Sequence, residues 1–194
     1  MCWIRNLKIK KLQKQLKNMQ QCRLQNQENA EMLKRELATY AKLAAIYEKL
    51  KGHKKFPFAR EQALACYRAA ASLNDVTAQF TLGEKILEEA KLRDVLQRND
   101  LFASSSNELF MKELYKEAHA FLLSAEKMQH IKAKRVRGLC YINGWGVPVD
   151  KNLGFDLVVA SIEQENSWDR VQKIFKELGI NNSSFFSELF RHRK

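Results

Sequence analysis

Proline and glycine are scarce in this chain, and neither occurs before Gly52. The 194 residues contain 2 prolines and 7 glycines, below the usual shares of about 5% and 7%. Apolar residues recur mostly at helical spacing, and no segment alternates apolar and polar residues as a half-buried strand does. The sequence therefore predicts an all-α fold, in a chain long enough to bury a hydrophobic core.

Paired cysteines are also missing. The four cysteines, Cys2, Cys22, Cys66 and Cys140, stand far apart without a Cys-x-x-Cys motif. This argues against a zinc site and against the disulfide framework of small secreted domains. Cys66 and Cys140 lie in apolar helical surroundings and are expected to act as small core residues. A reducing, cytoplasmic location is the expectation that follows.

Long apolar runs and catalytic motifs are absent as well. No apolar stretch approaches the roughly 20 residues of a transmembrane helix, and no signal-peptide segment follows the basic N-terminus. The four histidines show no metal-ligand spacing. The Gly144-Trp145-Gly146 segment follows no strand, unlike a phosphate-binding loop. We therefore expect no enzymatic activity, no cofactor, no metal site and no small-molecule substrate.

What the chain does contain is an internal repeat of small residues. The stretches 63–83 and 118–138 match each other at a spacing of 55 positions. The matched pairs are Ala63 and Ala118, Ala70 and Ala125, Ala78 and Ala133, and Gly83 and Gly138. Small residues allow successive helices to approach closely, as in stacked helical pairs. The spacing predicts a short α-solenoid of antiparallel helix pairs.

The second copy runs on into a pattern typical of a turn between two helices. Gly144 can take the left-handed backbone that closes a helix, and Gly146 follows in the turn. Asp150 can then cap the next helix by accepting from its free backbone N–H groups. Tyr141 and Trp145 are expected to be buried between the helix layers, where they contribute to repeat packing rather than to a ligand site.

These residues resemble the Sel-one-like repeat family, relatives of the tetratricopeptide repeats. The match is carried by Ala133, Gly138, Tyr141, Gly144, Gly146, Val147 and Asp150, and in the earlier copy by Tyr67, Ala70, Ala71, Ala78, Leu82 and Gly83. Gly154 departs from the family pattern, which usually has alanine there, and Arg137 replaces a leucine. The resemblance covers roughly residues 38–165 and implies a scaffold that binds other proteins.

Composition and resemblance together divide the chain into two parts. Residues 1–30 form a basic Lys/Gln-rich helical extension, and residues 31–194 form the solenoid. Within the solenoid we expect a degraded repeat over 38–77, a repeat with an insertion over 78–132, a repeat over 133–165 and capping helices over 167–190. The insertion amounts to about 19 residues near 95–107. We expect a loop there, either an ordinary one or one that contacts a partner.

Local signals predict several helix ends. Ser104 to Asn107 can cap a long helix over 108–128, and Ser167 can cap a helix over 168–178 that closes at Gly179. A final short helix carries Phe186 and Phe190. It is expected to cover the last layer of the solenoid, and the two rings would mark a docking patch if they were exposed.

Residues 1–30 hold much of the positive charge of the chain. Seven Lys and Arg residues lie within the first 23 positions, and no acidic residue precedes Glu28, in a chain of net charge +12. The apolar residues Ile9, Leu12, Leu16 and Met19 share one side of a helix because they follow 3-4-3 spacing. Two interpretations stay open. In the first, this apolar seam packs on a partner protein while Lys10, Lys11, Lys14 and Lys17 meet its acidic residues. In the second, the helix folds back onto its own solenoid.

The function expected from these features is that of a non-catalytic scaffold or adaptor with several protein partners in one complex. The resemblance, by analogy, implies an accessory subunit of a larger bacterial assembly, such as a Dot/Icm-type type IV secretion coupling complex, at the cytoplasmic face of a membrane. Nucleic-acid binding through the basic helix is an alternative, although residues 4–39 lack the aromatics that favour single strands. A secreted effector that binds a host protein is a second alternative. Peripheral membrane contact through Trp3, Ile4 and Leu7 also stays open.

Overall fold

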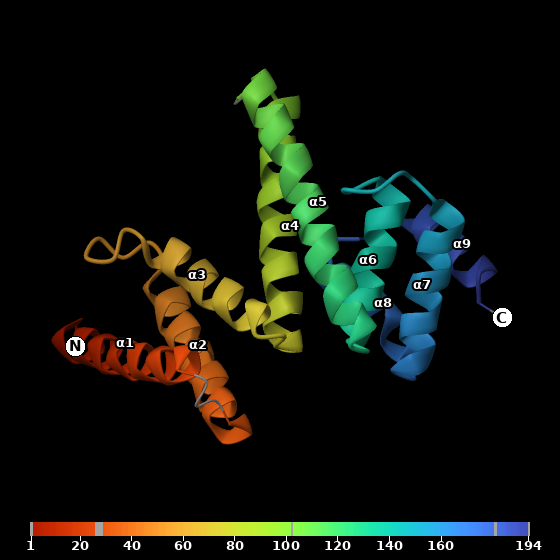
Figure 1. The fold of residues 1–194 in the computed structure, drawn as a ribbon. Coiled ribbons are helices and arrows are strands. Elements are labelled where there is room, and N and C mark those ends of the chain that lie inside the picture. Colours follow the sequence, from red (N-terminus) through yellow and green to blue (C-terminus); the bar gives the residue numbers. More distant parts are fainter. Residues whose placement is uncertain (1, 26–28, 102, 181, 194) are drawn as a thin grey trace. The chain divides into compact units, whose positions relative to one another are not determined.

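The structure, a computed structural model, is built from helices. It describes residues 2–25, 29–101, 103–180 and 182–193, together with the side chains of those residues from Arg5 onward, and no strand occurs among them (Figure 1). Adjacent helices pack in pairs, so the all-α prediction with a repeat-like arrangement is confirmed. None of the described helices is both long enough and apolar enough to cross a membrane.

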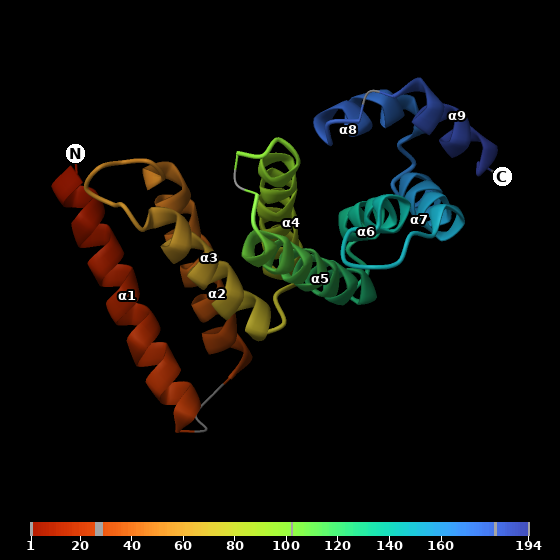
Figure 2. The same ribbon diagram turned by 90° about the horizontal axis from the view of Figure 1, so that it is seen from above.

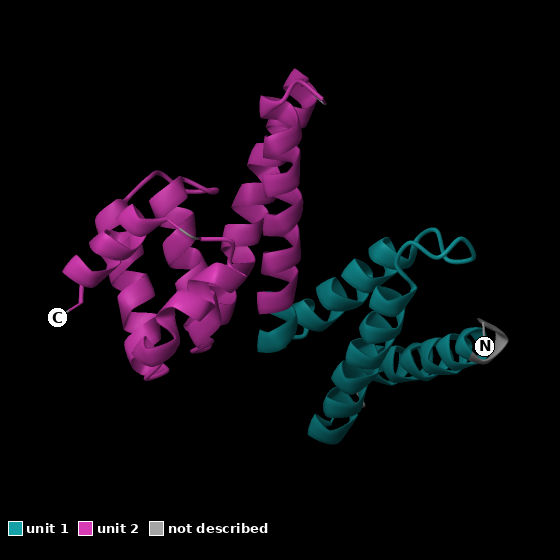
Figure 3. Cartoon of the chain, turned by 180° about the vertical axis from the view of Figure 1, so that it is seen from behind, with its two compact units in different colours: residues 1–79 teal, residues 80–194 magenta. Residues whose placement is uncertain are grey.

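The chain forms two compact units, residues 1–79 (unit 1) and residues 80–194 (unit 2), which Figure 3 shows in different colours. Their boundary falls within helix α4 (Val76–Arg98). Unit 1 also contains α1 (Cys2–Leu24), α2 (Ala30–Leu50) and α3 (Ala59–Ser72). Unit 2 continues with α5 (Ser105–Lys127), α6 (Ile131–Asn143), α7 (Lys151–Gln164), the short 3-10 helix η1 (Trp168–Arg170), α8 (Val171–Glu177) and α9 (Ser183–Arg191). The predicted extension over 1–30 and the start of the predicted solenoid thus lie in one compact unit.

Helix α1 packs against α2 through its apolar side (Figure 2). Ile9, Leu12 and Leu16 are buried, and Met19 is half-buried. Of the two interpretations of this seam, the structure therefore shows the one in which the helix folds back. The three buried side chains are covered within unit 1 and are not free to meet a partner, because α2 presents a matching apolar face.

Two glutamines fix the register of this contact. The Gln13 amide donates to the Tyr47 hydroxyl at 3.1 Å, and the Gln20 amide donates to the Tyr40 hydroxyl at 2.7 Å. The two glutamines are seven residues apart, as are the two tyrosines, and they pair in opposite order. The helices therefore run antiparallel with the seven-residue period of a coiled coil.

Three short turns, in which the next helix begins two residues after a left-handed residue, share one hydrogen-bond pattern, and the same hydrogen bond also closes α4, α6 and α8. A left-handed residue, Asn74, Gln129 or Asn166, follows the first helix with φ of 61°, 63° and 49° respectively. The N–H of the next residue then donates to the carbonyl five positions back, in the pairs Asp75 to Ala70, His130 to Ala125 and Ser167 to Ile162. The first two turns are 55 positions apart and the last two are 37 apart. The sequence pattern indicated only the first two.

The two matched alanines occupy equivalent settings. The amide of Ala78 donates to Asp75 Oδ1 at 2.7 Å, and the amide of Ala133 donates to His130 Nδ1 at 3.2 Å. Both alanines are buried. Each stands three residues after the capping residue of its helix, as the 55-residue spacing predicts.

Glycine allows a close helix crossing between α6 and α7. A Cβ on Gly138 would lie 2.6 Å from the Gly154 carbonyl oxygen, and a Cβ on Gly154 would lie 2.8 Å from the Gly138 carbonyl oxygen. Both distances are too short for an alanine without moving a backbone. Gly154, which departs from the family pattern, is thereby explained as the partner of Gly138.

The insertion in the second repeat is helical, so the expected loop over 95–107 is wrong. Helix α4 has 23 residues against 13 in α6, and α5 has 23 against 14 in α7. These two differences account for the 19 extra residues. Only residues 99–104 lie between the two helices, because residues on both sides of the predicted loop continue the antiparallel pair (Figure 1).

Most predicted caps are present. Ser104 Oγ accepts from the Asn107 amide at 3.0 Å, and Asp150 Oδ1 accepts from the Leu153 amide at 3.0 Å. Gly144 is left-handed with φ of 72°. Ser167 is the exception, because its side chain makes no capping hydrogen bond and its hydroxyl lies 3.4 Å from Glu165 Oε2 instead.

We expect Gly138→Ala to lower the free energy of unfolding by about 1–3 kcal/mol, although alanine is the better helix former. The added methyl group would meet backbone atoms of α7. Gly83→Ala is the comparison and is expected to lose less, since the closest neighbour of its added methyl group is a side-chain atom, Leu122 Cγ at 2.9 Å, rather than a backbone atom. Chemical denaturation of both variants measures the difference. Equal stability of Gly138→Ala and the wild type would contradict the crossing.

We expect Leu16→Ala to speed amide hydrogen exchange in α1 by at least about 30-fold, because a buried Leu-to-Ala change costs about 2–5 kcal/mol. Leu7→Ala is the control, since the Leu7 side chain is 48% exposed. Hydrogen exchange followed by mass spectrometry resolves α1 from the rest. Unchanged exchange in the Leu16 variant would mean that α1 does not rest on α2.

Candidate functional site

A groove in unit 2 crosses α4, α6 and α8. Helices α4 and α6 directly follow the first two of the three short turns, and α8 follows η1, which comes after the third turn. The groove encloses about 540 Å³. Its apolar lining consists of Phe80, Val136, Ile174 and Leu178, and its charged lining consists of Glu84, Lys132, Arg135, Glu165, Arg170 and Glu177. Apolar groups and charges of both signs therefore face the same space.

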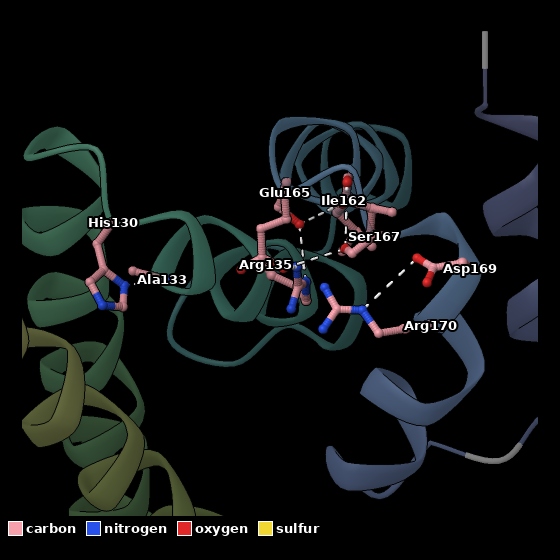
Figure 4. Close-up of polar contacts among 10 residues, drawn as sticks. His130, Ala133, Arg135, Ile162, Glu165, Ser167, Asp169 and Arg170 are labelled. Atoms are coloured by element: carbon pink, nitrogen blue, oxygen red, sulfur yellow. Dashed lines mark hydrogen bonds and ion pairs between the residues drawn. The ribbon is translucent and has the colours of Figure 1, made fainter.

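One charged pair in this groove is structural. Arg135 is 4% exposed, its Nε donates to Ser161 Oγ at 3.2 Å, and its guanidinium pairs with the Glu165 carboxylate. Figure 4 shows this pair beside Ser167, joining α6 to the turn after α7. Removing one partner of such a pair leaves a buried charge without compensation. Arg135 and Glu165 thus hold the wall of the groove in place.

The remaining cations of the groove are exposed. Lys132 and Arg170 both lie at the surface, and the Arg170 Nε is 3.9 Å from Asp169 Oδ1 in exposed surroundings. Such an ion pair contributes little to stability in water. Both side chains are therefore available to a molecule that enters the groove, and Figure 4 shows Arg170 beside Asp169.

Glu84 gives the groove a charge that changes near neutral pH. Burial and, to a lesser extent, the neighbouring Glu88 carboxylate together raise the pKa of Glu84 to about 7, although Lys132, Lys85 and Lys91 act against the rise. The groove therefore gains negative charge as the pH increases through neutrality.

The aromatic residues near the turns serve packing. The Phe80 and His130 rings stack at 4.2 Å between centroids, and burial lowers the pKa of His130. The Trp145 ring stacks on Tyr115 at 6.2 Å and lies 3.9 Å from Lys91 Nζ. Trp145 is half-buried rather than fully buried, and Tyr141 is also half-buried. Each of these contacts joins neighbouring helices, as repeat packing requires.

The helical extension formed by the ends of α4 and α5 exposes large apolar side chains. Leu92 and Val95 on α4, Leu101 in the connection, and Leu109 and Phe110 on α5 are all exposed. The extension is ordered by contacts between its helices, since the Arg93 guanidinium donates to Asn107 Oδ1 at 3.2 Å. Exposed apolar groups on an ordered element are typical of protein-binding surfaces.

The sequence-predicted partner residues are distributed over both units. Lys10, Lys11, Lys14 and Lys17 are exposed on α1, whereas Ile9, Leu12 and Leu16 are buried beneath it. The side chains of Trp3 and Ile4, proposed for membrane contact, lie outside the described residues, as do residues 26–28 between α1 and α2.

The two C-terminal rings differ in their surroundings. Phe186 is half-buried and packs on Phe175 and Phe185 in the core cluster of α7 to α9. It therefore acts as a cap rather than as a docking residue. Phe190 is 47% exposed but stacks on Trp168 at 5.8 Å.

A second groove, in unit 1, was not foreseen. It encloses about 320 Å³ and lies between α1 and the connection from α2 to α3. Ile9, Lys10 and Gln13 line one side, and Lys55, Phe56, Pro57 and Phe58 line the other. The adjacent phenylalanines around Pro57 were the available sequence signal, but nothing in the sequence placed them beside α1.

No group of three or more His, Cys, Asp or Glu side chains is arranged to hold a metal ion within the described ranges. Burial raises the pKa of Cys66 to about 11 and that of Cys140 to about 12. Both thiols therefore stay protonated at neutral pH and are poor nucleophiles.

We expect Glu84→Gln to stabilise the protein at pH 8 but not at pH 4. The pKa of Glu84 in the folded state, about 7, lies above the ordinary value of 4.5. The stability that the protonated Glu84 side chain contributes to the folded state is therefore fully present below pH 4.5 and is lost as the pH rises through 7. Thermal unfolding of variant and wild type across this range gives the comparison, with Glu163→Gln on the exposed face of α7 as the control. A Tm difference that does not change with pH would show that Glu84 is not perturbed.

Comparison with known proteins leaves the chain without an assigned family. No family model matches the sequence, and no curated protein matches it either.

Proposed function

We propose that the protein is a non-catalytic helical-repeat scaffold that binds a polypeptide segment of a partner protein in the groove across α4, α6 and α8. The observation that carries the proposal is the composition of this groove: four apolar side chains lie among exposed charges of both signs. Helices in equivalent positions of successive repeats form the extended surfaces with which helical-repeat proteins bind their partners.

The charge of unit 2 supports a protein rather than a polyanion as the occupant. Unit 2 contains 18 Lys and Arg residues and 16 Asp and Glu residues, a net charge of +2. A polypeptide with apolar side chains and charges of both signs can satisfy the apolar lining together with Lys132, Arg170 and Glu177. A nucleic acid would place its phosphates against Glu84 and Glu177.

The extension of α4 and α5 supports contact with more than one partner surface. Its exposed apolar residues lie on a helical pair that is longer than the neighbouring pair α6 and α7. A scaffold that joins several subunits of one complex needs separate contact surfaces, and the groove and the extension provide two.

The resemblance to Sel-one-like repeats gives this scaffold a biological setting. Gly138, which stands at the crossing of α6 and α7, and Gly144, Gly146 and Asp150 after α6 are among the residues on which the resemblance rests. By that analogy we place the protein as a cytoplasmic accessory subunit of a larger bacterial assembly, such as a type IV secretion coupling complex. A secreted effector that binds a host protein would use the same groove.

A photocrosslinking amino acid at Ile174, within the groove, tests the proposal in the native cell. We expect one or a few discrete protein adducts, and we expect the combined change Lys132→Glu and Arg170→Glu to reduce their yield several-fold. The same crosslinker at Asp156, an exposed position on α7 outside this groove, is the control.

Circular dichroism verifies that each variant remains folded. The absence of an adduct from Ile174, or the same adducts from Asp156, would contradict binding in this groove.

A further inference from the structure

The positive charge of the chain is concentrated in unit 1. This unit contains 16 Lys and Arg residues and 6 Asp and Glu residues, so it accounts for +10 of the net charge of +12. Helix α1 contains no acidic residue. A helical unit of this size with such a charge favours an extended anionic partner over one that carries charges of both signs.

Helix α1 presents a line of cations away from α2. Lys10, Lys14 and Lys17 are exposed and share one face, because they follow i, i+4, i+7 spacing. None of the three has an ion-pair partner in the part of the chain that the structure describes. The buried residues of α1 face the other way, so the line stays accessible while α1 is docked.

The line of cations begins at the unit 1 groove. Lys10 belongs to both, and Lys55 faces it from the connection between α2 and α3. Figures 1 and 2 both show this connection next to the N-terminal half of α1. The described residues that line the groove include no carboxylate, and Gln13 and Gln62 contribute amide groups.

The groove also contains an exposed aromatic ring. Phe58 is 68% exposed, although it lies among the lining residues with Pro57 and the half-buried Phe56. An exposed phenyl ring between lysines is the arrangement on which nucleic-acid bases stack while cations contact the phosphates.

We infer that unit 1 binds single-stranded nucleic acid, with a base on Phe58, amide contacts from Gln13 and Gln62, and the backbone along Lys10, Lys14 and Lys17. This activity is separate from the proposed peptide groove, which lies in unit 2. An aromatic ring within reach of the basic helix removes the objection that residues 4–39 contain no aromatic side chain.

A single strand fits these features better than the other anionic partners do. An acidic protein would pair with the lysines but would give the exposed Phe58 ring and the amides no specific role. A duplex keeps its bases stacked, so it cannot offer a base face to the ring. Deoxyribose and ribose strands share the chemistry required here.

Fluorescence anisotropy with labelled 20-residue oligomers of dT and U, and the full chain, tests the inference and compares the two sugars. We expect Phe58→Ala to weaken binding by about 5- to 150-fold, the equivalent of one lost base stack, and Phe58→Trp to retain it. We expect the triple change Lys10→Glu, Lys14→Glu and Lys17→Glu to reduce the slope of log affinity against log salt by about 2. The charge-matched control replaces Lys151, Lys173 and Lys176, which are exposed in unit 2, by Glu.

Four results would overturn the inference. They are the absence of binding to both oligomers at low salt, wild-type affinity in Phe58→Ala, an equal loss in the unit 2 control, and equal competition by polyglutamate or by phosphatidylserine vesicles. Retention of binding by the control, with loss in both unit 1 variants, supports it. The peptide groove and its crosslinking position, Ile174, lie in unit 2. A negative result in these oligonucleotide-binding experiments therefore does not contradict the proposed peptide groove.

Discussion

The close approach of α6 and α7 at Gly138 and Gly154 is the constraint on which unit 2 depends. With no side chain on either glycine, the two backbones come within contact distance, and Val158 packs directly against Gly138. Leu139, Val158 and Ile162 can then join one core cluster with α8 and α9. Interiors packed at this density do not admit an extra methyl group without displacement. The crossing also fixes α6, and with it Arg135 and Val136 in the wall of the groove.

The repeated turn converts this local packing into an extended surface. Three short turns carry the same left-handed residue and the same backbone hydrogen bond. The helices that follow them, α4, α6 and, after η1, α8, all contribute residues to the groove. Lengthening α4 and α5 leaves this turn intact, because the extra residues are added at the far ends of both helices. A binding surface can thus be enlarged without disturbing the crossing.

Much of unit 2 could be predicted from the sequence because its signals are local. Gly144 and Asp150 act through their own backbone and side chain, so their roles follow from residue type and spacing. The third turn is not part of the sequence match because it lies 37 rather than 55 positions after the second, although the hydrogen bonds are the same. The insertion was mistaken for a loop because its polar residues suit either a loop or a solvated helix, and pairing of α4 with α5 decides between them.

The unit 1 groove could not be predicted, because it depends on long-range pairing. The apolar residues of α1 follow the same spacing whether they pack on a partner protein or on α2. The pairing of Gln13 and Gln20 with Tyr47 and Tyr40 becomes evident only in the antiparallel arrangement of the two helices. That pairing brings Lys10 into the same groove as Phe58, which stands 48 positions later in the chain. The candidate sites thus depend on tertiary contacts, whereas the repeats depend on local ones.

Unit 2 as described requires that the glycine backbones of α6 and α7 touch. Nuclear Overhauser effects between the Hα protons of Gly138 and Gly154 measure this contact. We expect a strong cross-peak between the two residues in the folded protein. Assigned Hα resonances without such a cross-peak would place the two helices farther apart and exclude this packing.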